Sequence, residues 1–343
     1  MRRIFIIITS FIISTNCFGQ AKPSYTQYIL NNYILNPALT GIENYTDIRL
    51  SNRNQWTGIP GAPVTSYFSF HTPIGKPDDR ATATSFQKQG VNPRGAQYWT
   101  DYTVPAAHHG VGLAAINDKA GYLNRWSIHA SYAYHKPLSV RTSLAAGMHA
   151  GISSVNLDRT KIYWATLNPN DPAIGYANNE LKKVRPELGA GLWLYSPDYF
   201  VGLSVLNIIP GKQQFVLNDK YGQFYSPNYF LTAGYRFLLG EDFNLLPSFM
   251  LQYWQPQLTG LHLNTKLQYR DIAWFGAGYR FSNMIGGYSA MGGLNISNTL
   301  NIGYSYEVAT TSRLRNYTGN THEIMIGLIL GNRFGDNCPR NVW

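Results

Sequence analysis

Leu300-Asn-Ile-Gly-Tyr-Ser-Tyr-Glu-Val308 alternates apolar and polar side chains along its whole length. Even-numbered positions carry leucine, isoleucine, tyrosine and valine, and odd-numbered positions carry asparagine, glycine, serine and glutamate. Because successive side chains of a β-strand point to opposite faces, this period of two predicts a strand with one apolar and one polar face. The same alternation recurs at 126–134, 261–269 and 322–330.

Working outward from these segments, the pattern predicts about fourteen strands. Many of them run for 9–12 residues. A strand that crosses a membrane needs about 9–11 residues, whereas a globular strand has about 5–6. The predicted strands lie at 44–53, 64–73, 108–117, 123–135, 141–154, 186–195, 199–207, 227–239, 243–253, 259–270, 272–281, 287–296, 299–308 and 321–331.

The connections alternate between short turns, as at 196–198 and 239–242, and longer segments, as at 155–185 and 309–320. Short periplasmic turns and longer outer loops are typical of an outer-membrane barrel, and a closed barrel satisfies every backbone group in lipid. We therefore expect an all-β fold, a transmembrane outer-membrane barrel of antiparallel strands spanning 44–331. The segment 74–107 breaks the alternation; a miscounted strand would explain it, but we favour a periplasmic insertion.

The N-terminus predicts export. Arg2 and Arg3 precede the apolar run 4–13, and small residues stand at the expected cleavage site, so 1–19 fits a secretory signal peptide. Charged residues make up 13% and aromatic residues 14% of the chain, which argues against disorder. The net charge is +10, but the basic residues are scattered, so we expect no nucleic-acid partner. The tail at 332–343 is not assigned a structure.

The leader at 20–43 mixes apolar and amide residues and ends in a turn signal, Asn36-Pro37 followed by Gly41. Two interpretations stay open. The leader either fills the barrel lumen as a plug or is a frayed periplasmic segment.

A search for catalytic chemistry finds none of the common signatures: no Gly-x-Ser-x-Gly, no His-Glu-x-x-His and no phosphate-binding glycine loop. His108 and His109 lack further ligands at metal spacing, and Cys338 stands in a polar tail without a nearby base. We expect no enzymatic activity, no metal and no cofactor.

Charged residues on the predicted strands fall on the polar faces. A charge on the lipid face costs about 2–4 kcal/mol at mid-bilayer, so these side chains are predicted to face the lumen. They either line a polar channel or fill the lumen together with the leader, and we favour the filled lumen. The set is Arg49, Arg53, Arg236, Lys266, Arg270, Arg280, Glu307 and Glu323. Aromatic residues near strand ends, such as Trp126, Tyr195 and Trp274, suit interfacial girdles.

Several motifs together resemble one family, the PorP/SprF outer-membrane proteins of the Bacteroidetes type IX secretion and gliding system. The resemblance covers about 24–331 and departs from the family at 76–107. The motifs are Asn36-Pro37-Ala38-x-x-Gly41, Arg53-x-Gln55-Trp56-x-Gly58, Gly61-Ala62-Pro63, Ser69-Phe70-His71-x-Pro73, Asn117-Asp118-x-x-Gly121, Ser131-Tyr132-Ala133-Tyr134-His135 and His322-Glu323-Ile324-Met325.

The resemblance implies a non-enzymatic component of type IX secretion that supports export or surface anchoring of a cargo protein such as a large adhesin. It implies partners in the lipid bilayer, the cargo, and the periplasmic and lipoprotein components of the machinery. The alternative is a porin or transporter for a small solute; a soluble secreted β-sandwich adhesin fits the long strands poorly.

Within this framework we expect Arg53 and Gln55 to tie the barrel wall to the leader, and the residues after Trp56 to shape the first outer loop. The alternative is that Gln55-Trp56 is only a strand end with an interfacial ring.

Overall fold

The structure is a computed structural model, and part of the chain is described in it. The described residues are 28, 31–76, 104–157, 182–209, 211–213, 223–225, 227–240, 242–254, 258–270, 272–282, 286–297, 299–310 and 319–331. The predicted signal peptide at 1–19, most of the insertion at 74–107 and the tail at 332–343 lie outside them.

Strands make up nearly all of the described chain, preceded by two short 3₁₀ helices, η2 (Asn32–Ile34) and η3 (Pro37–Leu39). In order, the strands are β1 (Thr46–Asn54), β2 (Val64–Ile74), β3 (His108–Ala120), β4 (Leu123–Pro137), β5 (Ser143–Leu157), β6 (Lys182–Tyr195), β7 (Tyr199–Leu206), β8 (Gly211–Gln213), β9 (Gln223–Tyr225), β10 (Asn228–Tyr235), β11 (Phe237–Leu239), β12 (Phe243–Trp254), β13 (Leu258–Tyr269), β14 (Ala273–Ser282), β15 (Gly287–Asn295), β16 (Leu300–Ala309) and β17 (Thr321–Leu330).

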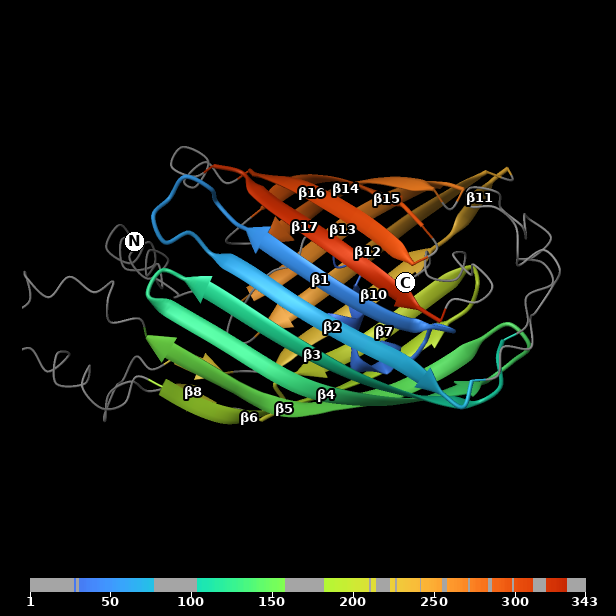
Figure 1. The fold of residues 1–343 in the computed structure, drawn as a ribbon, viewed down its shortest axis with the longest axis horizontal. Coiled ribbons are helices and arrows are strands. Elements are labelled where there is room, and N and C mark those ends of the chain that lie inside the picture. Colours follow the sequence, from blue (N-terminus) through green and yellow to red (C-terminus); the bar gives the residue numbers. More distant parts are fainter. Residues whose placement is uncertain are drawn as a thin grey trace, which may run out of the picture.

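The large sheet closes into a barrel (Figure 1). Each strand pairs antiparallel with its neighbour, β1 pairs with β17, and β10 pairs with β12. β11 continues the line of β10 after an interruption at Arg236 and pairs with the same neighbour, so the wall has fourteen strands. The predicted antiparallel barrel of about fourteen strands is confirmed.

The two faces of the wall differ as the alternation predicts. On β17, Ile324, Ile326 and Leu328 point outward, whereas Glu323 and Met325 between them are buried. An apolar outer face beside a polar inner face is what a barrel in lipid requires. Tyr195 and Trp274, expected in an interfacial girdle, are buried instead; they stand at the inward positions of β6 and β14.

The barrel has two rims. The turn rim carries the short connections 138–142, 196–198 and 240–242, and the loop rim carries 55–63 and the connections from β5 to β6 and from β16 to β17. The connection from β2 to β3 leaves the turn rim, and at its far end the Val104 amide donates to the Val140 carbonyl of the β4–β5 turn at 2.9 Å. The insertion therefore starts and ends on the rim of the short turns, where the alternation of connections predicts it.

Two details differ from expectation. Between the predicted strands at 199–207 and 227–239, two short strands form, β8 and β9, which pair as a separate small sheet. The strands on either side of the long β5–β6 connection extend further than predicted, so β5 reaches Leu157 and β6 starts at Lys182. β3 also extends, to Ala120, beside the short β3–β4 turn. Among the described residues, no helix is long and apolar enough to cross a membrane.

Candidate functional site

The segment 31–43 lies inside the barrel, where Figure 1 shows it in blue within the ring of strands. All of its residues are buried. Its side chains and carbonyls bond to β2, β4, β6 and β7, and Tyr28, just before it, bonds to β13 in the opposite part of the ring. We call 31–43 the plug. The sequence left this position open, and the structure places the plug in the lumen.

Asn36 shapes the plug and fastens it to the wall. Its side-chain oxygen accepts from the Ala38 amide at 3.0 Å and caps η3, while Pro37 occupies the first helical position, where no amide hydrogen is needed. The Asn36 amide nitrogen donates to the carbonyls of Leu192 and Leu203, at 3.0 and 3.2 Å. One side chain thus sets the local turn and joins it to β6 and β7.

Further anchors surround the plug. Tyr33 and Thr40 both meet the Ser131 hydroxyl of β4, at 2.8 and 2.9 Å. Additional bonds run from Asn31 to Ser69 of β2, from Ser204 of β7 to the Leu35 carbonyl, from Lys76 to the Ile42 carbonyl, and from Asn264 of β13 to the Tyr28 hydroxyl just before the plug.

Glycines form the wall where the plug backbone comes closest. A Cβ at Gly147 of β5 would lie 2.6 Å from the Ala38 Cα, and one at Gly112 of β3 would lie 2.6 Å from the Tyr33 hydroxyl. A Cβ at Gly110 would overlap the Thr40 carbonyl, and one at Gly191 the Asn36 amide. Side chains at these inward positions would exclude the plug, so the wall is built to receive it.

Histidines hold the turn that ends the plug. The Gly41 amide donates to His71 Nδ1 at 3.3 Å, and His135 Nε2 lies 2.9 Å from the Thr40 carbonyl. His108 stacks on His135 with ring centroids 4.5 Å apart. Gly41 has φ +73, and a Cβ there would lie 3.2 Å from the Pro73 Cα, which is why glycine stands at this position.

The motif residues Asn36, Pro37, Gly41, His71 and Pro73, far apart in sequence, therefore form one plug-docking site. Replacing Asn36 with alanine removes the η3 cap and both wall bonds. A lost cap costs about 1 kcal/mol and each of the two lost hydrogen bonds about 1 kcal/mol, so the opening free energy of the plug is expected to fall by about 3 kcal/mol. Hydrogen exchange of the plug amides checks this.

The matched control is Asn54→Ala, because Asn54 is exposed on the outer face of β1. Plug exchange in that variant is expected to equal that of the natural protein. Equal protection of the plug in the Asn36 and Asn54 variants would count against the docking role.

The charged lumen residues form a separate cluster on the wall. Glu307 of β16 lies between two guanidinium groups, with Arg53 Nη2 3.0 Å from one carboxylate oxygen and Arg280 Nη1 3.1 Å from the other. Arg53 is 1% exposed and Glu323, its partner in register on β17, is 0% exposed. Arg49 pairs with Asp47 at 2.7 Å on the same strand, β1.

Two expectations about charge need correction. Arg53 is paired with Glu307 and not with the plug. The backbone amide of Gln55 donates to the Pro63 carbonyl and so joins the two ends of the first loop. The predicted tie to the leader is therefore not formed with 31–43. Arg270 lies in the β13–β14 turn, where it pairs with Asp242 at 2.9 Å, because the strand ends one residue earlier. Arg236, Lys266, Arg280 and Glu307 are buried on the inner face as predicted from parity.

The remaining motif residues gather on the loop rim. The Trp56 amide donates to Thr321 Oγ1 at 3.3 Å, and the Gly121 amide donates to the Gly61 carbonyl at 2.8 Å. The first loop, 55–63, is thereby bonded to the β16–β17 connection on one side and to the β3–β4 turn on the other. Below it, Thr65 donates to Asp118 at 2.8 Å.

Two other motif residues of this rim point outward. Asn117 donates to Asn124 at 2.9 Å, and His322 meets the Tyr304 hydroxyl at 2.7 Å on the outer face. Trp56 (φ +55) marks the bend of the loop 55–63 rather than a plain strand end. That this loop lies on the outer side of the membrane stays a prediction.

Sequence reasoning missed the glycine wall and Ser131 as plug contacts. Counting along the strands places four glycines on the inner face: Gly110, Gly112, Gly147 and Gly191. This count does not show which part of the protein each glycine contacts.

A cavity of about 90 Å³ remains beside Ile34 and Leu35 of the plug and is lined by His129, His149 and Glu187. Within the described part of the chain, no group of three or more His, Cys, Asp or Glu side chains is placed to hold a metal ion.

A closed barrel with an apolar outer face, here with a segment of its own chain in the lumen, defines an outer-membrane β-barrel. The model of the family described as type IX secretion system membrane protein PorP/SprF matches residues 17–328. The chain belongs to this family, and the resemblance inferred from its motifs is confirmed.

Solved structures are similar at low identity. CymD, a monoaromatic hydrocarbon channel, is 14% identical with a TM-score of 0.46, over 91% of this chain and 94% of that chain. The toluene transporter TbuX of Ralstonia pickettii is 11% identical with a TM-score of 0.47, over 91% and 96%. The outer-membrane protein Omp33 of Acinetobacter baumannii is 8% identical with a TM-score of 0.44, over 85% and 99%. No curated protein matches the chain.

Proposed function

We propose that this protein is a non-enzymatic, non-conducting component of type IX secretion that supports export or surface anchoring of a cargo protein such as a large adhesin. The observation that carries the proposal is the plug: a member of a secretion family has its bore occupied by buried residues that bond to strands around the wall. A rigid, filled barrel presents two rims and no path for a solute.

The two rims suit different partners. The loop rim, where 55–63 is fixed by bonds to both neighbouring connections, gives a preformed surface for cargo outside the cell. The turn rim carries the ends of the 74–107 insertion and would face the periplasmic and lipoprotein components of the machinery. Orientation follows from the usual placement of short turns on the periplasmic side.

Deleting the gene in its host is expected to leave the cargo inside the cell or unattached in the medium, with other type IX cargoes unaffected. Surface proteomics of deletion and complemented strains measures this. Unchanged surface proteins would contradict the role in secretion.

A second measurement separates the proposal from a small-solute porin. The purified barrel in planar bilayers is expected to show no steady conductance, because the plug occupies the bore. Steady open channels in the natural protein would favour the porin alternative.

A further inference from the structure

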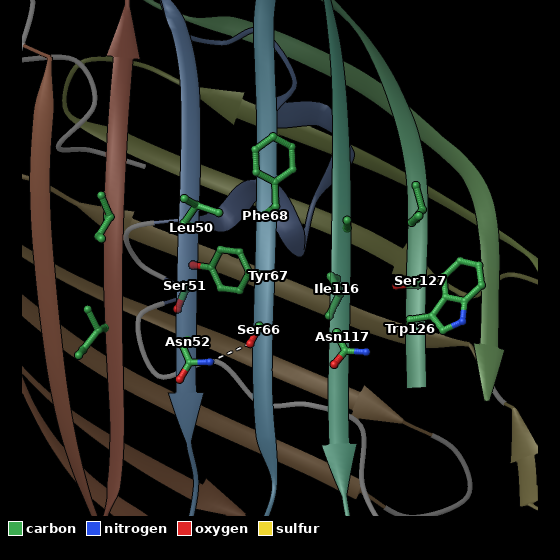
Figure 2. A pocket seen from close by; sticks show the side chains of 14 residues that line it. Leu50, Ser51, Asn52, Ser66, Tyr67, Phe68, Ile116, Asn117, Trp126 and Ser127 are labelled. Carbon is green, nitrogen blue, oxygen red and sulfur yellow. Dashed lines mark hydrogen bonds between the residues drawn. The ribbon is translucent and has the colours of Figure 1, made fainter. Parts of the chain in front are cut away.

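The outer face of the barrel is hollowed over β17, β1, β2, β3 and β4. This groove has a volume of about 720 Å³, and Figure 2 looks at it from close by. Its outward lining includes Leu50, Phe68 and Ala115 in one part and Asn52, Ser66 and Asn117 in the other. We call it the outer-wall groove.

Strand register arranges the lining in two cross-strand rows. Asn52 pairs with Ser66, Ser66 with Asn117, and Asn117 with Trp126, which makes a row of hydrogen-bonding side chains toward the loop rim. The next outward row, toward the turn rim, is apolar: Leu50 pairs with Phe68, Phe68 with Ala115, and Ala115 with Ile128. A polar row directly above an apolar row is the profile of a membrane interface.

Small residues stand between larger ones in both rows: Ser66 lies between Asn52 and Asn117, and Ala115 lies between Phe68 and Ile128. Figure 2 shows Phe68 on the central strand, β2, and the ring of Trp126 at one side of the groove. The neighbouring strands are fully paired at this point, so no free backbone edge offers itself to a strand of another protein.

The polar row has hydrogen-bonding capacity directed outward. Asn52 donates one amide hydrogen to Ser66 at 2.8 Å, and Asn117 donates one to Asn124 at 2.9 Å. Each primary amide has a second hydrogen and an acceptor oxygen. None of the groove's lining residues is charged, so the complementary ligand has an apolar chain and a neutral polar group at its head.

We propose that the outer-wall groove binds one acyl lipid of the surrounding leaflet. An acyl chain lies over Leu50, Phe68 and Ala115, and its ester or amide carbonyl accepts a hydrogen bond from Asn117 or Asn52. The occupant follows from continuity with the lipid-facing wall, of which the groove is part. The proposal goes beyond the role in secretion and does not depend on it.

The experiment uses the full-length barrel in detergent, stripped of lipid and incubated with dipalmitoyl phosphatidylethanolamine, with native mass spectrometry as the readout. One lipid is expected to stay bound at collision energies that remove the rest. Ala115→Phe fills the groove and is expected to reduce this retained lipid at least tenfold. The matched control is Ala277→Phe, since Ala277 also stands on the outer face of the barrel, on β14 away from the groove; its lipid retention is expected to be unchanged.

Two further arms keep the test decisive. Ser66→Leu fills the same space if Ala115→Phe does not fold. Asn117→Leu should weaken retention of the phospholipid but not of hexadecane, which has no carbonyl. The proposal is overturned if no lipid is retained or if Ala115→Phe and Ala277→Phe retain the same amount of lipid. It is also overturned if a crosslinker placed at position 115 in cells captures a protein rather than a lipid.

Discussion

Gly147→Ala is expected to unseat the plug. The added methyl group would lie 2.6 Å from the Ala38 Cα and would overlap the Pro37 carbonyl, and both partners are backbone atoms that cannot rotate away. Overpacking of this kind costs about 1–3 kcal/mol, which raises the open population of the plug by a factor of about 5 to about 150. Planar-bilayer recordings should then show channel openings that the natural protein lacks, together with faster hydrogen exchange across 31–43.

The matched control is Gly260→Ala. Gly260 also faces the lumen, from β13, but the nearest atom to an added Cβ is 3.5 Å away on a flexible side chain, His262. Its conductance and exchange are expected to stay those of the natural protein. If the two alanine variants behave alike, close packing of plug against wall is not what closes the bore.

Glu307→Gln is expected to destabilise the barrel wall strongly. The substitution keeps the shape of the side chain but removes the carboxylate that pairs with both Arg53 and Arg280, whose side chains are 2% and 9% exposed. Breaking a buried ion pair from one side costs about 3–5 kcal/mol because a buried charge loses its partner. Urea unfolding in lipid vesicles, followed by heat-modifiable migration, measures the free energy of unfolding.

Asp242→Asn gives the comparison for this prediction. Asp242 and Arg270 form an ion pair of similar length, but their side chains are 44% and 38% exposed on the turn rim. An exposed pair contributes about 0.2–1 kcal/mol, so the control should lose little stability. A second change, Arg280→Met in the Glu307→Gln background, should recover part of the loss. If the Glu307→Gln and Asp242→Asn variants lose the same free energy of unfolding, burial is not the reason why the Glu307 cluster stabilises the barrel.

The wall of this protein could be predicted from its sequence because alternation is a local property. Every residue of a strand points to the face opposite its neighbour, so the inward position of Arg280 or Glu307 follows from counting along the chain. Arg270 fails this rule for a local reason: the strand ends at Tyr269, and parity has no meaning in a turn. Tyr195 and Trp274 lie near strand ends, which favours an interfacial girdle, but they stand at inward positions of their strands and are buried.

The candidate site could be predicted only in part. The motifs at 36–41, 69–73 and 131–135 can each be recognised in the sequence. The sequence does not show that His71, Ser131 and His135 contact the plug. The motif around Arg53 predicts a buried polar contact between Arg53 and the leader. Its partner instead stands 254 residues away on β16, which barrel closure brings within one strand of β1.

The sequence by itself determined that this chain is a barrel, which faces of its strands meet lipid, and to which family it belongs. Those properties reside in the period of two and in short motifs, which are set residue by residue along the backbone. Only the tertiary structure decided that 31–43 lies in the lumen, which glycines receive this plug, and that 55–63 is fixed between two other connections. These depend on strand register and closure, which bring together residues that no local pattern links.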